Sequence, residues 1–144
     1  MQVVSWLIRY GHVLAATMWV GGYALLAFFI IPFIEQGERE KLIPFAINIV
    51  RFLTYTGTLT MGFGIVLITR TNGFSDLFGS AWGSCILTAF VIAVALLGIG
   101  DGALRPAIRR MKTESGTAAR RWAIIGFALT VLAVGVMTAA TFVG

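Results

Sequence analysis

The chain has 144 residues, of which 58% are hydrophobic and only 12% are charged, and its formal net charge is +5. A soluble domain is about half apolar and about a quarter charged, so this composition suits lipid better than water. Together with a mean hydropathy of +0.91, it excludes an ordinary soluble domain and predicts an integral membrane protein.

Four apolar segments are each long enough to cross a hydrocarbon core, which takes about 20 helical residues. They cover about residues 3–33, 42–69, 83–104 and 121–143. Residues 25–31 are continuously apolar, whereas a transmembrane strand alternates apolar and polar positions. We therefore expect an all-α protein, an antiparallel four-helix bundle that forms one transmembrane domain over residues 1–144. The first segment is too long for a signal peptide and should be retained.

The distribution of positive charge predicts the topology. The loop after the third segment carries one acidic residue, Glu114, and six basic ones: Arg105, Arg109, Arg110, Lys112, Arg120 and Arg121. The loop after the first segment adds Arg39 and Lys41, whereas the middle loop has Arg70 offset by Asp76. Short cytoplasmic loops collect Lys and Arg. The first and third loops should therefore lie inside and both termini outside, in a cytoplasmic membrane, with lipid and no nucleic acid as partner.

The single histidine, His12, lies within the first segment. An ionisable side chain at bilayer depth indicates a functional site, and imidazole is a common ligand of haem iron and of copper. Arg9, Ala16 and Trp19 share its helical face by spacings of three and four. Ala16 leaves room for a flat macrocycle or for a neighbouring helix. We expect His12 to bind haem b iron, Arg9 to bind a haem propionate, and Trp19 to line the site.

Met61 and Met137 are the candidates for a second iron ligand. Counting along the helices at about 1.5 Å per residue places both at a depth similar to that of His12. A His/Met pair holds the iron of c-type cytochromes, although methionine more often fills gaps between helices. A homodimer that offers His12 twice is the other route to two ligands.

Two further ionisable residues lie within the segments. Arg51 shares a helical face with Asn48 and Tyr55, and it could bind a propionate or a lipid headgroup, or extend to the inner interface. Asp101 precedes Arg105 by four residues, the favourable order for a helical ion pair, so we interpret it as structural.

Small residues at a spacing of four predict the contacts between helices, because they let backbones approach closely in lipid. They are Thr56, Thr60 and Gly64 on the second helix, Ala89 and Ala93 on the third, and Gly135 and Ala139 on the fourth. Cys85 is the only cysteine, so it cannot form an intrachain disulfide and we expect it to pack between helices.

Residues 12–22, His-Val-Leu-Ala-Ala-Thr-Met-Trp-Val-Gly-Gly, resemble the first-helix signature of the CopD/HemJ-like superfamily of small membrane proteins. Met61, in a stretch rich in small residues, is similar to the second helix of that family. The resemblance implies a helical membrane protein that binds haem b through His12. Its HemJ-like branch implies oxidation of protoporphyrinogen and relies on an intramembrane lysine, which this chain lacks. Its CopD-like branch implies copper uptake.

Three functions therefore stay open. The chain could be a b-type haem protein for electron transfer or redox chemistry in the bilayer, or a copper-handling transport protein. It could also be an accessory subunit of a larger membrane complex, such as a respiratory one, in which His12 only forms a hydrogen bond between helices. The sequence has no His/Cys cluster for zinc and no phosphate-binding loop, which argues against hydrolase, kinase and nucleotide-binding functions.

Overall fold

A computed structural model describes residues 2–37, 39–71 and 73–143, and within these ranges every element is a helix. In chain order the elements are α1 (Gln2–Leu25), the π-helical turn η1 (Leu26–Ile30), α2 (Ile31–Glu35), α3 (Arg39–Arg70), the 3-10 turn η2 (Phe74–Asp76), α4 (Ala81–Gly98), the π-helical turn η3 (Ile99–Leu104), α5 (Arg105–Arg110) and α6 (Thr117–Val143).

The elements join into four long helices. Elements α1, η1 and α2 form one helix over Gln2–Glu35, and α4, η3 and α5 form another over Ala81–Arg110. With α3 and α6, these are four helices long and apolar enough to cross a membrane. The prediction of an all-helical fold with four helices able to span a membrane is thus confirmed for the described residues.

The third and fourth helices are longer than the predicted segments. The third helix continues to Arg110 instead of ending near 104, and α6 begins at Thr117 instead of near 121. Hydropathy marks where a chain enters the hydrocarbon core, whereas helical hydrogen bonds continue into the polar interface. Most of the basic residues that we assigned to a loop therefore lie on the ends of helices.

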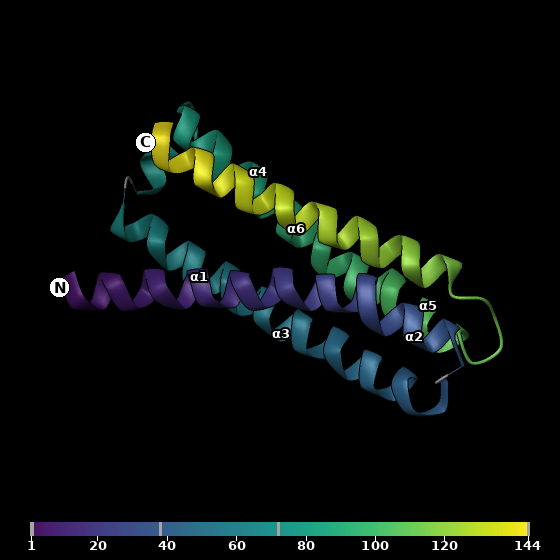
Figure 1. Ribbon diagram of the computed structural model, residues 1–144. Coiled ribbons are helices and arrows are strands. Elements are labelled where there is room, and N and C mark those ends of the chain that lie inside the picture. The colour runs from purple at the N-terminus through teal and green to yellow at the C-terminus, as the bar shows by residue number, and fades with distance from the viewer. Residues whose placement is uncertain (1, 38, 72, 144) are drawn as a thin grey trace.

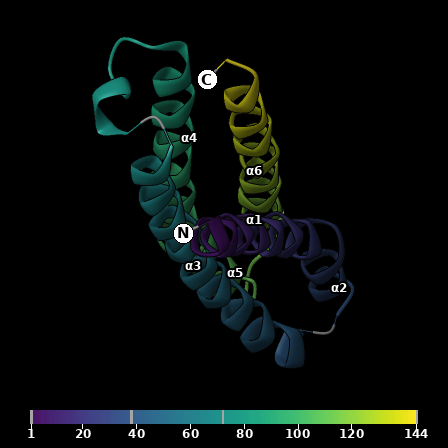
Figure 2. The same ribbon diagram turned by 90° about the vertical axis from the view of Figure 1, so that its left-hand side faces the viewer.

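The helices form two hairpins, α1 with α3 and α4 with α6, and each pair packs along much of its length. The ends labelled N and C lie at the same end of the molecule, and α2 and α5 lie at the other (Figure 1). The hairpins are close together near α2 and α5 and diverge toward the labelled chain ends (Figures 1 and 2). Large, fully buried side chains fill the closed end: Leu26, Ile31, Ile34, Leu104 and Ile108.

A π-helical turn precedes a proline in both hairpins. Element η1 ends just before α2, which has Pro32 in its first turn, and η3 ends just before α5, which has Pro106 there. Proline has no N–H and its ring collides with the carbonyl four residues earlier. A widened turn directly before the proline relieves that conflict without ending the helix.

The small-residue prediction holds for α3 and α4 but is wrong for α6. Thr56, Thr60, Ala89 and Ala93 are buried. Gly135 and Ala139, by contrast, are exposed, and the buried face of α6 is formed by Ala119, Ala123, Gly126, Thr130 and Ala140. Small residues occur on more than one face of α6, so spacing alone did not identify the face that packs.

Tyr23 joins the two hairpins at the centre of the molecule. It is only 1% exposed, and its hydroxyl donates to the Leu96 carbonyl of α4 at 3.1 Å. Its ring lies directly against Gly126 of α6, where a Cβ atom would overlap it. Tyr23 therefore requires a residue without a side chain on the neighbouring helix.

We predict that Gly126→Ala lowers the free energy of unfolding by about 1–3 kcal/mol, the usual cost of overpacking a core. Gly135→Ala on the same helix is the control, because among the described residues no atom lies within 4 Å of the added Cβ, and alanine favours helix over glycine. Unfolding in mixed micelles, followed by circular dichroism, measures both. Equal stability of the two variants would contradict the contact between Tyr23 and Gly126.

Candidate functional site

The diverging ends of the two hairpins border an open cavity of about 720 Å³. All four long helices contribute to its walls, and most of the lining side chains are apolar or small. Cofactor sites are usually concave, largely apolar and about 300–1,000 Å³ in volume, with a few polar groups that fix the ligand. The cavity has this size and character.

His12 supplies the imidazole of this cavity. Its Nδ1 lies 2.7 Å from the backbone carbonyl oxygen of Thr60 on α3. A carbonyl oxygen only accepts hydrogen bonds, so Nδ1 carries a proton and donates it. In the neutral ring Nε2 then has a free lone pair, and it makes no hydrogen bond to any described residue. A backbone carbonyl on one ring nitrogen is the usual arrangement of a metal-ligating histidine, because it fixes both tautomer and orientation.

Gly64 makes the close approach of His12 to α3 possible. A Cβ at this position would lie 3.2 Å from Cε1 of the imidazole, closer than ordinary contact allows. The Thr60 hydroxyl donates to the Thr56 carbonyl at 2.7 Å, so it is engaged within its own helix. The imidazole ring of His12 thus contacts the backbone of α3 at Thr60 and at Gly64.

Trp19 lies seven residues after His12 and contacts α3 in the same way. It is 5% exposed, and Cζ2 of its indole would be 2.8 Å from a Cβ at Gly57. Trp19 lines the cavity, and its indole also lies against Gly57 of α3. Its position serves helix packing as well as the cavity wall.

Met61 of α3 and Met137 of α6 also line the cavity, and both are partly buried. Arg9, His12 and Trp19 line it too, so the structure brings together at one cavity all five residues that the sequence singled out. Within the described ranges no group of three or more His, Cys, Asp or Glu side chains could hold a metal ion. The donors available here are therefore one imidazole and two thioethers.

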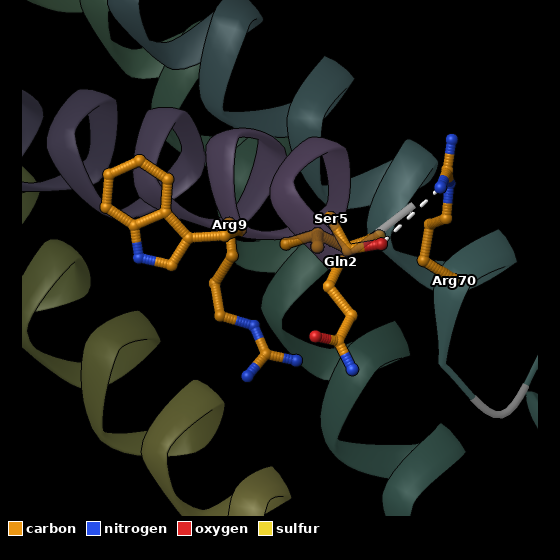
Figure 3. A pocket seen from close by; sticks show the side chains of 6 residues that line it. Gln2, Ser5, Arg9 and Arg70 are labelled. Carbon is orange, nitrogen blue, oxygen red and sulfur yellow. Dashed lines mark hydrogen bonds between the residues drawn. The ribbon is translucent and has the colours of Figure 1, made fainter.

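Arg9 is exposed at the edge of the cavity, where it also borders a second pocket of about 520 Å³. Figure 3 shows this pocket with Gln2, Ser5 and Arg70, and the guanidinium of Arg70 donates to the Ser5 hydroxyl at 3.4 Å. In that view the side chain of Arg9 extends toward a different side from that of Arg70. The sequence identified Arg70 only as a loop charge, and its place at this pocket was not predicted.

Arg51 and Asp101 are not part of the cavity lining. The predicted ion pair of Asp101 with Arg105 is confirmed, and Asp101 also accepts a hydrogen bond from the Thr54 hydroxyl at 3.1 Å. Arg51 is exposed on α3. A propionate of a haem in this cavity would therefore find Arg9 and not Arg51 at the rim.

Comparison with known proteins gives no match: no protein-family model fits the chain, and no curated protein or solved structure is significantly similar to it. The resemblance of residues 12–22 to the CopD/HemJ-like superfamily thus remains a hypothesis. The function has to be argued from the cavity itself.

We predict that the imidazole of His12 carries its proton on Nδ1. Because it is the only histidine, 15N labelling of histidine reports on this ring alone, and the 15N shifts of cofactor-free protein distinguish the two neutral tautomers. Gly64→Leu should displace the ring and lose the single tautomer. Gly62→Leu should not, since no described atom lies within 4 Å of that position. A proton on Nε2 in the unsubstituted protein would contradict the hydrogen bond to Thr60.

Proposed function

We propose that this protein binds haem b in the membrane and serves electron transfer or redox chemistry there. The single observation that carries the proposal is the orientation of His12. Its Nδ1 is engaged by the Thr60 carbonyl at 2.7 Å, so Nε2 is left as the free donor of a residue that lines a largely apolar cavity. One imidazole is sufficient to hold haem iron.

The other lining residues fit the same cofactor. Apolar and small side chains suit a flat, apolar macrocycle. Arg9 at the edge of the cavity would hold a propionate by charge-assisted hydrogen bonds. Met61 or Met137 would supply a second iron ligand, and a methionine ligand raises the reduction potential. When bound, the haem would supply one-electron chemistry, whereas the chain would supply the ligand, its orientation and an apolar surrounding.

We further propose that the four helices form an antiparallel bundle in a cytoplasmic membrane with both termini outside. Arg39, Arg109 and Arg110 lie at the end of the molecule that holds α2 and α5. The enrichment of cytoplasmic loops in Lys and Arg supports placing this end inside. The cavity would then lie in the outer half of the bilayer, open to a redox partner or to a membrane-soluble substrate.

The chain's residues do not favour the protoporphyrinogen oxidation that the HemJ-like resemblance implies. That branch relies on an intramembrane lysine, and this chain has two lysines, Lys41 and Lys112. Neither lines the cavity. We therefore carry over haem binding alone from the resemblance.

A copper-handling transport protein is the second candidate, because one imidazole and two thioethers border the same cavity. Thioether and imidazole are suitable ligands for Cu(I). In this case His12, Met61 and Met137 would be the complete donor set. A copper ion has no anionic group that Arg9 could bind, so the position of Arg9 beside the cavity would then be unexplained.

We predict a Soret band, with about one haem per chain at saturation, in protein purified from cells with adequate haem supply. Removing the hydrogen-bond partner of a metal ligand typically lowers affinity about 10–100-fold. His12→Ala removes the ligand itself, so it should lower haem affinity by more than this. Phe142→Ala, an exposed change at the end of α6, is the control. Equal haem content and spectrum in wild type and His12→Ala would refute the ligand assignment, and pigment-free wild type would favour the accessory subunit.

We also predict that replacing the second ligand changes the reduced haem spectrum and lowers the reduction potential. Met61→Leu and Met137→Leu keep the side-chain volume. The variant whose reduced haem spectrum differs from that of the wild type therefore identifies the ligand. Copper analysis of the same two proteins tests the alternative. Copper bound at one ion per chain and lost in both variants, without a Soret band, would replace the haem proposal by the copper one.

A further inference from the structure

Helix α3 carries a second polar surface that faces away from the cavity. Starting from Asn48, alternating steps of three and four residues lead along one face of the helix, which we call the α3 seam. Its members are Asn48, Arg51, Tyr55, Thr58 and Gly62; all are exposed, and none lines the cavity. This is the spacing of positions that meet when two helices pack side by side along their length.

The α3 seam is unusual for a surface that faces lipid. Of the four membrane-spanning helices, α3 is the least apolar, and polar residues in membrane helices normally face protein or a water-filled cavity. The side chains of Asn48, Arg51 and Tyr55 nevertheless make no hydrogen bond to any described residue. Hydrocarbon offers no donors or acceptors, so a neighbouring protein surface that supplies them at this face would stabilise these groups.

Asp101 lies beside the α3 seam and has acceptor capacity left. It receives the Thr54 hydroxyl at 3.1 Å and pairs with Arg105, yet its side chain is still 45% exposed. Thr54 is three residues from Arg51, so a carboxylate and an unpaired guanidinium occupy the same lateral surface within about one helical turn of each other. Within the part of the chain that the structure describes, Arg51 forms no ion pair.

We propose that the α3 seam is the interface with a second copy of this chain, related by a two-fold axis along the membrane normal. Such an axis preserves depth, so Arg51 of each copy lies within about one helical turn of the depth of Asp101 of the other, and two equivalent ion pairs can form. Thr58 and Gly62 of the seam are small enough for close backbone approach. In Figure 2, α3 lies at the lower left border of the molecule, with its outer side free for a neighbour.

This interface keeps the two cavities apart. Thr60 and Gly64, which seat His12, lie on the inner face of α3, whereas Thr58 and Gly62 lie on the outer face. Each copy therefore retains its own His12 cavity, and the second copy does not supply a second imidazole. The proposal does not depend on haem binding.

The first test is cysteine cross-linking in native membranes with a Cys85→Ser background, which removes the only native thiol. Thr58→Cys and Gly62→Cys should form a disulfide-linked species of twice 15.5 kDa when oxidised with iodine. Val91→Cys on α4 and Leu132→Cys on α6, both exposed at mid-helix, should remain monomeric. Equal cross-linking at the control positions, no cross-linking at either seam position, or cross-linking to a species of another mass would overturn the proposal.

The second test concerns the ion pair. Loss of an interhelical polar contact in a membrane typically costs about 0.6 kcal/mol, about threefold, so losing both symmetric pairs in Arg51→Ala should weaken dimerisation about tenfold. Energy transfer between labelled copies diluted in detergent measures this, and Arg51→Lys should retain most of the affinity. Arg120→Ala, another exposed arginine, on α6 and outside the cavity lining, is the control. Equal effects of Arg51→Ala and Arg120→Ala would refute the pairing, and haem content measured on the same samples reports separately on the cavity.

Discussion

The close crossing of α1 and α3 is the contact on which the rest of this structure depends. Lipid provides no hydrophobic drive between helices, so they associate through packing and hydrogen bonds that need close backbones. His12 and Trp19 are seven residues apart on α1, and the glycines that accept them, Gly64 and Gly57, are seven residues apart on α3 in the opposite order. Two large side chains thus fix the register of the hairpin. The hydrogen bond from His12 to the Thr60 carbonyl follows from that register.

The cavity exists because the two hairpins are packed tightly at one end only. At the end with α2 and α5, large apolar side chains fill the space between the hairpins. There the π-helical turns let both long helices continue through a proline without ending. Tyr23 connects α1 to Leu96 of α4 and to Gly126 of α6 at the point where the hairpins begin to separate. Beyond Tyr23, small residues such as Ala89 and Ala93 face inward, and the space they leave is the cavity.

Hydropathy and helical spacing were enough to predict the four helices, the Asp101–Arg105 ion pair, and Met61 and Met137 as residues at the depth of His12. These features depend on properties of a single helix or on distance along its axis. The Thr60 carbonyl as partner of His12, the place of Arg70 beside the second pocket and the exposure of Gly135 could not be predicted. Each depends on how a helix is rotated and how it crosses its neighbour, and those angles are set by packing between residues far apart in sequence.

The ionisable groups within the predicted segments differ in how their polar atoms are satisfied. These differences indicate a different role for each group. His12 is oriented by a backbone carbonyl and keeps one nitrogen free, which is the condition of a ligand. Asp101 is bound by Arg105 and Thr54, which is the condition of a structural charge. Arg51 forms no ion pair among the described residues, and an unpaired charge in hydrocarbon is costly. Because His12 of α1 contacts one face of α3 and Arg51 lies on the opposite face of that helix, the proposed cofactor binding and the proposed association with a second copy should be lost independently of each other.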